Sequence, residues 1–139
     1  AMVSLARHYG AGSMSVAAIA KDSAIPYAYL EQLILPLRKS GLVEARRGAH
    51  GGYRLTRPPA EVRLGEVYRV MEGPIAPMDC VSEEQTDQTC PLIPGCQTRP
   101  VWIKVRDSIA STLDSMTLAD LIEQQPASAA IDVASPIAV

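Results

Sequence analysis

The sequence predicts a mainly α-helical fold with one small β-hairpin. Apolar residues make up 47% of the 139 residues, yet Phe is absent and aromatic residues reach only 4%. A core must therefore be assembled from Leu, Ile, Val and Ala, which suits packed helices. Apolar residues also recur at the spacing of an amphipathic helix in several segments. A glycine-rich stretch at 48–52 separates two short runs that predict paired strands.

Three helices are predicted before the hairpin. The opening helix carries four apolar residues on one face, Met2, Leu5, Ala6 and Tyr9. Ser15 is a favourable N-cap for a second helix over 16–22. Pro26 stands where a third helix starts. The expected buried face of this third helix holds Tyr29, Leu30, Leu33, Ile34 and Leu37.

The second and third helices predict a helix–turn–helix, because about four residues separate them. Any small helical hairpin gives the same pattern. Gly41 follows the third helix, as at many helix C-termini, and we expect Pro36 to bend it. Strands are predicted over 42–47 and 53–56, and Pro58 ends the second one. A hairpin directly after a helix–turn–helix predicts a winged helix–turn–helix domain, with a plain basic hairpin as the alternative.

The distribution of charge favours nucleic-acid contact by the first half of the chain. The formal net charge is −2, but residues 1–71 hold ten Lys and Arg against five Asp and Glu. Residues 72–139 hold three basic and ten acidic residues. This asymmetry indicates contact with nucleic acid. The narrow glycine tip and the basic residues of the hairpin predict that the hairpin approaches a groove or the phosphates of duplex DNA. The expected DNA contacts are Tyr27, Ala28, Glu31, Gln32, Arg38, Arg46, Arg47, His50, Gly51, Gly52 and Arg54.

The second half predicts a short helix over 64–72, an irregular segment and a long helix from Pro100. So long an amphipathic helix in a small chain favours a homodimer seam, with packing inside the chain as the alternative. The expected dimer contacts are Trp102, Val105, Ile109, Leu113 and Met116. Thr117 and Asp120 predict a capping box that opens a short terminal helix.

These elements predict a winged helix–turn–helix DNA-binding domain at 1–73, a cysteine-bearing sensor loop at 74–98, a dimerisation helix with the terminal helix at 99–123, and a flexible tail at 124–139. The chain has no catalytic triad pattern, phosphate-binding loop or dinucleotide fingerprint, so we do not expect an enzyme. It also lacks a signal peptide and an apolar run near the ~20 residues of a membrane span. We expect a cytoplasmic protein with no membrane partner.

Six segments together resemble one family. They are 29–33 (YLEQL), 37–43 (LRKSGLV), 47–55 (RGAHGGYRL), 72–75 (EGPI), 96–102 (CQTRPVW) and 113–121 (LDSMTLADL). The combination resembles the winged helix–turn–helix iron–sulfur transcription regulators of the IscR and NsrR type. The resemblance implies a bacterial homodimer with crossed long helices that binds a palindromic operator in double-stranded DNA, as a repressor more often than an activator. It also implies that Ala28, Glu31 and Gln32 face bases, and that the family's first helix starts before Ala1.

Three cysteines, Cys80, Cys90 and Cys96, are spaced C-x9-C-x5-C in the irregular segment. Thiolates in one loop suit an iron–sulfur cluster and also zinc, although zinc usually takes closer pairs such as C-x2-C. A third interpretation involves no metal, because thiols also oxidise reversibly. The resemblance implies that the three cysteines hold a [2Fe-2S] or [4Fe-4S] cluster together with one further ligand.

The cysteine segment departs from the family pattern in two places. The first gap is longer than in IscR-like relatives, and Arg99 stands where IscR offers a histidine. Because a guanidinium does not ligate iron, the fourth ligand is expected from Asp79, Asp87, the first helix of the partner subunit or a small molecule. Cluster gain or loss is expected to change the distance between the two recognition helices. Iron status, nitric oxide, oxygen and peroxide all remain open as the signal.

Overall fold

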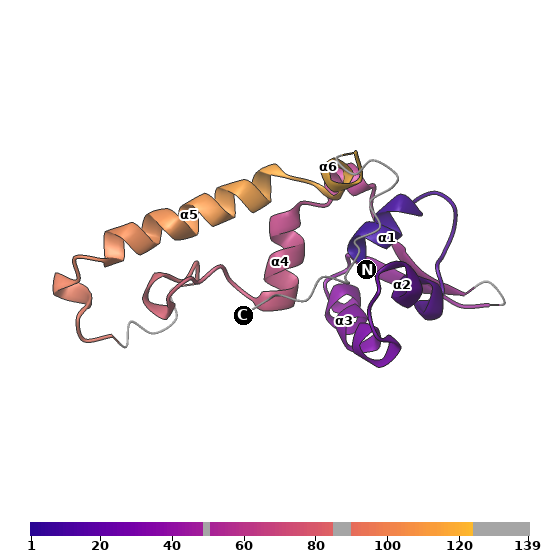
Figure 1. The fold of residues 1–139 in the computed structure, drawn as a ribbon, viewed down its shortest axis with the longest axis horizontal. Coiled ribbons are helices and arrows are strands. Elements are labelled where there is room, and N and C mark those ends of the chain that lie inside the picture. The colour runs from indigo at the N-terminus through magenta and orange to yellow at the C-terminus, as the bar shows by residue number, and fades with distance from the viewer. Residues whose placement is uncertain (49–50, 85–89, 124–139) are drawn as a thin grey trace, which may run out of the picture.

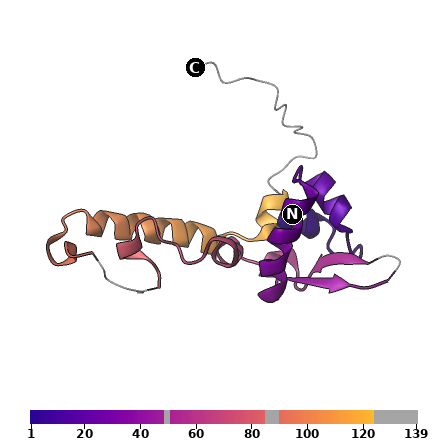
Figure 2. The ribbon, with the colours of Figure 1, turned by 90° about the horizontal axis from the view of Figure 1, so that it is seen from below.

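The computed structural model describes residues 1–48, 51–84 and 90–123. Figure 1 shows several short helices and the hairpin gathered at one end, with the long helix α5 (Arg99–Ser115) extending away from them. Helix α4 (Leu64–Glu72) lies between these two parts. Figure 2 shows the same separation between α5 and the hairpin from a second direction. The predicted mainly helical fold with one hairpin is confirmed.

The second and third helices begin and end where local signals predict, whereas the first ends before Tyr9. They are α1 (Met2–Arg7), α2 (Val16–Asp22) and α3 (Tyr27–Lys39). The hydroxyl of Ser15 accepts the Ala18 backbone N–H at 3.1 Å, which confirms the predicted N-cap. Gly41 follows α3 with a φ of 78°, the left-handed conformation that glycine favours. Helix α3 continues across Pro36 and ends at Lys39.

Two residues predicted on the apolar faces of their helices, Tyr29 and Tyr9, are exposed. Leu30, Ile34 and Leu37 form the buried face of α3, but Tyr29 is 54% exposed. Tyr29 lies about 100° around the helix from Leu30, and the neighbouring elements cover a narrower stripe than the sequence pattern indicates. Tyr9 is 45% exposed because α1 ends at Arg7, so Tyr9 does not share the helical face of its predicted neighbours.

Strands β1 (Val43–Arg46) and β2 (Gly52–Leu55) pair antiparallel, with Val43 opposite Leu55 and Arg46 opposite Gly52. Tyr53 also forms a bridge to Met14, because each backbone N–H donates to the other residue's carbonyl, at 2.8 and 2.9 Å. A Cβ on Gly52 would overlap the Met14 carbonyl. Glycine is therefore required at position 52 by a close backbone approach, in addition to its place beside the turn.

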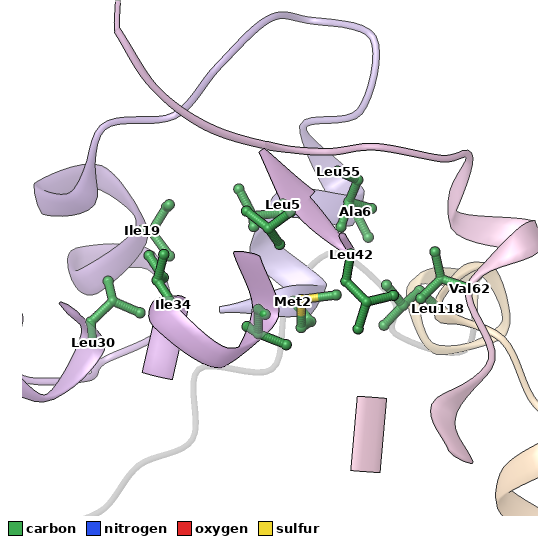
Figure 3. Close-up of a cluster of buried hydrophobic side chains, with 12 residues drawn as sticks. Met2, Leu5, Ala6, Ile19, Leu30, Ile34, Leu42, Leu55, Val62 and Leu118 are labelled. Atoms are coloured by element: carbon green, nitrogen blue, oxygen red, sulfur yellow. The ribbon is translucent and has the colours of Figure 1, made fainter. Parts of the chain in front are cut away.

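The core joins segments that are far apart in the sequence (Figure 3). Leu118, the first residue of α6 (Leu118–Glu123), is 1% exposed and packs in the same cluster as Leu5 and Val62. Its backbone N–H donates to the Val62 carbonyl at 3.0 Å. The predicted capping box is confirmed, since Thr117 N–H donates to the Asp120 carboxylate at 2.7 Å. The chain thus returns to the first domain after α5.

Helices α4 and α5 cross closely. A Cβ on Gly65 would overlap the carboxylate of Asp114, so any other residue here would displace the Asp114 side chain. The segment between them contains two short 3-10 helices, η2 (Asp79–Val81) and η3 (Ile93–Gly95), and η2 packs against α5. Within the described ranges, no helix is both long and apolar enough to cross a membrane.

Candidate nucleic-acid interface and cysteine segment

The exposed face of α3 carries the residues predicted to meet bases. Tyr27, Ala28, Glu31 and Gln32 are all exposed, with Tyr27 at 51%. They lie in the first two turns of α3, whose opposite side is held by buried apolar residues. The apolar contacts fix the helix against the domain, so the exposed face presents donors, acceptors and a phenol to the outside.

The hairpin adds two kinds of arginine. Arg46 and Arg47 are exposed, and among the described residues neither takes part in an ion pair. Arg54 differs, because its guanidinium pairs with the carboxylate of Glu44 on the facing strand. Gly51 continues the turn by donating its N–H to the Gly48 carbonyl at 2.9 Å. The predicted contact at position 50 lies outside the described residues.

Arg38 connects α3 to the hairpin. Its guanidinium carbon lies 5.9 Å from the centre of the Tyr53 ring, within the range of a cation–π contact. This contact adds to the buried cluster that contains Leu37, Val43 and Leu55, which holds the end of α3 against the hairpin. No local pattern predicts this role of Tyr53, because the contact joins residues that are far apart in the sequence.

The predicted dimer stripe of α5 divides into two parts. Its first part is exposed, with Val101 at 59%, Trp102 at 36%, and Val105 and Ile109 at 37% each. Leu113 and Met116 are half-buried, near the crossing with α4. No residue of α5 is fully buried in the single chain. The apolar surface therefore lies on the part of α5 that extends beyond α4 (Figure 1).

The three cysteines are free thiols, and each is half-buried. Two arginines of α5 form hydrogen bonds with the backbone at Cys80 and at the next residue. Arg99 Nε donates to the Cys80 carbonyl at 3.4 Å, and a guanidinium N–H of Arg106 donates to the Val81 carbonyl at 3.1 Å. Arg99 therefore has a structural role at the position where the resemblance led us to look for a ligand.

Cys96 lies just before the N-terminus of α5. Its Sγ is 3.3 Å from Thr98 Oγ1. The pKa of the Cys96 thiol is lowered, first by the Thr98 hydroxyl, then by the backbone N–H groups of Thr98 and Arg99, with a further contribution from the charge of Arg99. This position favours the thiolate, which is both the nucleophilic form of cysteine and the form that binds metals.

The donor chemistry fits an iron–sulfur cluster, since three thiols lie in one segment and one of them favours the thiolate. The three are not gathered around one point. Among the residues that the structure describes, no group of three or more His, Cys, Asp or Glu is arranged to hold a metal ion. Metal binding by Cys80, Cys90 and Cys96 would thus require the segment to close.

The helix–turn–helix, the basic hairpin and the extended helix define the class of the protein, a winged helix–turn–helix DNA-binding regulator. Residues 1–124 match the Rrf2 family, described as "Iron-dependent Transcriptional regulator", and the chain belongs to this family. It is similar to the "HTH-type transcriptional regulator CymR" of Bacillus subtilis, with 40% identity over 120 residues that cover 86% of this chain and 80% of CymR.

Two solved structures are similar over nearly the whole chain. The structure titled "CymR (YrzC) the Global Cysteine Regulator of B. subtilis" has a TM-score of 0.72 and 38% identity, covering 90% of this chain and 89% of that one. The structure titled "T. potens IscR" has a TM-score of 0.71 and 39% identity, covering 91% and 85%. The predicted family and fold class are confirmed, and the chain is a transcription regulator rather than an enzyme.

The environment of Cys96 predicts a pH dependence that can be measured in a chain whose other two cysteines are serine. The rate of alkylation by iodoacetamide should rise with a midpoint below the usual cysteine pKa of about 8.5. Thr98→Val removes one hydrogen bond to the thiolate and should move the midpoint upward. Thr112→Val, on the same helix, is the control. Equal midpoints in all three chains would contradict this account of the site.

Proposed function

We propose that this regulator is a cytoplasmic homodimer that represses transcription by binding a palindromic operator, and that its three cysteines control its affinity for DNA. The observation that carries the DNA-binding site is the exposed polar face of α3 beside a basic hairpin, with both elements anchored in one apolar core. Under this proposal α3 enters the major groove, and the hairpin approaches the phosphates or the adjacent minor groove.

The two parts of the interface are assigned different tasks. Arg46 and Arg47 are exposed guanidinium groups, which suit phosphate contacts that raise affinity for any sequence. Glu31 and Gln32 project from α3 and suit hydrogen bonds to base edges, which carry the sequence information. Arg54 is assigned a supporting role, because its charge is committed to Glu44.

Arg47→Ala should weaken binding to every duplex by a similar factor and reduce the salt dependence by about one counterion. Gln32→Ala should instead reduce the preference for the selected operator over a scrambled duplex, by about 1–3 kcal/mol. Both are measured by fluorescence anisotropy over a range of salt concentrations, with an operator obtained by in vitro selection. Lys104→Ala, an exposed basic residue on α5, is the control. Binding unchanged in both test variants would contradict the assignment.

The homodimer is supported by the exposed part of α5. A helix of 17 residues projects from the domain with Val101, Trp102, Val105 and Ile109 at least 36% exposed. Contiguous apolar surface of this kind is usually covered by a partner. A second copy of the same helix would cover it, with one winged domain at each end of the dimer. Two-fold symmetry in the protein then matches a palindromic operator.

Ile109→Glu should convert the dimer to a monomer, because it places a charge in the middle of the apolar stripe. Ser111→Glu adds the same charge on the other side of α5, where it is exposed, and should leave the dimer intact. Sedimentation velocity at several protein concentrations distinguishes the two states. A monomer in the unmodified chain, or an intact dimer in the Ile109 variant, would contradict the proposed seam.

For the cysteines we propose an iron–sulfur cluster held by Cys80, Cys90 and Cys96. Such a cluster, when bound, supplies iron centres that respond to iron supply and to oxidants. The support is the donor chemistry of three thiols in one segment, together with the description of the family as iron-dependent. Asp79, next to Cys80, is exposed and is the described candidate for a fourth ligand. Asp87 lies outside the described residues.

A thiol switch without metal is the second candidate. The observation that favours it is the thiolate-stabilising position of Cys96 at the start of α5. In this case hydrogen peroxide transfers one oxygen atom to the Cys96 thiolate, which gives a sulfenic acid and releases hydroxide. The change at Sγ then alters the attachment of the cysteine segment to α5, with no cluster involved. Zinc is a weaker alternative, because the chain has no closely spaced cysteine pair.

Anaerobic purification of the chain distinguishes these candidates. The cluster proposal predicts a coloured protein with visible absorption and bound iron and sulfide, all lost when Cys80, Cys90 or Cys96 is replaced by serine. Asp79→Asn should alter the absorption if Asp79 is the fourth ligand. Glu84→Gln, an exposed acid in the same segment, should not alter it. A colourless, iron-free protein under these conditions would replace the cluster with the thiol switch, and bound zinc would replace both.

A further inference from the structure

Arg69 of α4 binds two carboxylates that come from different segments. Its Nε and one terminal nitrogen donate to the two oxygens of Glu83, at 2.9 and 2.5 Å. Its terminal nitrogens also donate to the two oxygens of Asp114 on α5, at 2.7 and 3.0 Å. Both contacts are bidentate, the geometry in which a guanidinium fixes the orientation of a carboxylate best. We call these three residues the Arg69 link.

Glu83 connects the Arg69 link to the cysteine segment. It lies three residues after Cys80, and its carboxylate also accepts the Ile75 backbone N–H at 2.9 Å. The Glu83 backbone N–H in turn donates to the Ile75 carbonyl at 3.2 Å, and Ile75 is 1% exposed. The hydrogen bonds from Arg69 lower the pKa of Glu83, so its carboxylate stays charged to a lower pH than that of an ordinary glutamate. Glu83 thus fixes the start of the cysteine segment to α4.

Asp114 connects the Arg69 link to the winged domain. It lies at the last turn of α5, packed over Gly65 at the crossing with α4. Its backbone carbonyl accepts a hydrogen bond from Arg63. Two residues later, the Met116 carbonyl accepts the Leu64 N–H at 2.9 Å. These hydrogen bonds join the α4–α5 crossing to the residues that connect α5 to the core.

We infer that the Arg69 link carries a change in the cysteine segment to the α4–α5 crossing, and through it to the orientation of the winged domain. The inference rests on the proposed function, in which the state of the cysteines controls DNA binding. Arg69 and Glu83 are positioning residues in this account, since they act through the segments that they hold together. The link suits this task because one guanidinium holds both segments at once, so neither can move without disturbing the other.

Glu83→Gln tests whether the Arg69 link transmits a change in the cysteine segment, without unfolding the protein. The substitution keeps the shape of the side chain and its acceptor for the Ile75 N–H, but it removes the charge that pairs with Arg69. Arg69 keeps its partner Asp114, so the α4–α5 crossing remains closed. Glu84→Gln is the matched control: it makes the same change of charge at the next residue, and Glu84 makes no hydrogen bond or ion pair among the described residues.

The first measurement is the affinity for the selected operator of the reduced apo-protein and of the protein loaded anaerobically with iron and sulfide. In the unmodified chain and in Glu84→Gln, the two affinities should differ by about tenfold, a typical size for coupling between sites. In Glu83→Gln the ratio should fall to about threefold or less while the tighter-binding state keeps its folding and its dimer. A ratio in Glu83→Gln equal to that of the control would overturn the inference.

The second measurement is hydrogen–deuterium exchange of α4 and α5 in the same two states. Loading should change exchange in both helices in the unmodified chain and in Glu84→Gln, but only in the cysteine segment in Glu83→Gln. A response of α4 and α5 that survives in Glu83→Gln would also overturn the inference. If the affinity of the unmodified chain does not depend on its cysteines, the proposed control of DNA binding fails, and the exchange data alone decide whether the Arg69 link transmits.

Discussion

The architecture depends on the return of the chain to the first domain after α5. Residues 62–64 pair with residues 116–118 through two backbone hydrogen bonds, and Leu118 fills the core beside Val62. This junction fixes the end of α5, while the start of α5 lies far from the core (Figure 1). The direction of α5 within the chain is therefore set by this junction and by the crossing with α4, while the segment that holds Cys80 packs along the rest of the helix.

Arginines hold the segment between α4 and α5 where apolar contacts are few. Arg69 binds Glu83, Arg99 binds the Cys80 carbonyl, and Arg106 binds the Val81 carbonyl. The planar fork of a guanidinium reaches two acceptors without full burial, which a lysine does not match. Ile75 and Val81 are the apolar anchors of this segment, at 1% and 2% exposed. A segment fastened mainly by polar contacts is easier to release than one packed in a core, which suits a sensor.

Local signals in the sequence predicted most of the helices, because each one acts within a single turn. Ser15 capped α2, and Thr117 with Asp120 capped α6, as expected from their spacing alone. Contacts between distant segments could not be predicted in this way. Tyr29 is exposed because of what its neighbours leave uncovered, and position 52 requires glycine because of the Met14 backbone. Likewise, three cysteines in one segment predicted metal binding or thiol oxidation. Their spacing did not predict the hydrogen bond from Arg99 to the Cys80 carbonyl.

The start of α5 both stabilises the Cys96 thiolate and holds the cysteine segment in place. The N–H groups that stabilise the Cys96 thiolate belong to Thr98 and Arg99, and Arg99 also holds the Cys80 carbonyl. At 1.5 Å per residue, α5 spans about 25 Å from this point to the junction with the core. Because the junction fixes the other end of α5, a rotation about that junction moves the start of the helix, and a partner bound there, most. The position of the cysteines, remote from the DNA-binding face, is therefore compatible with control of that face through the arrangement of two chains.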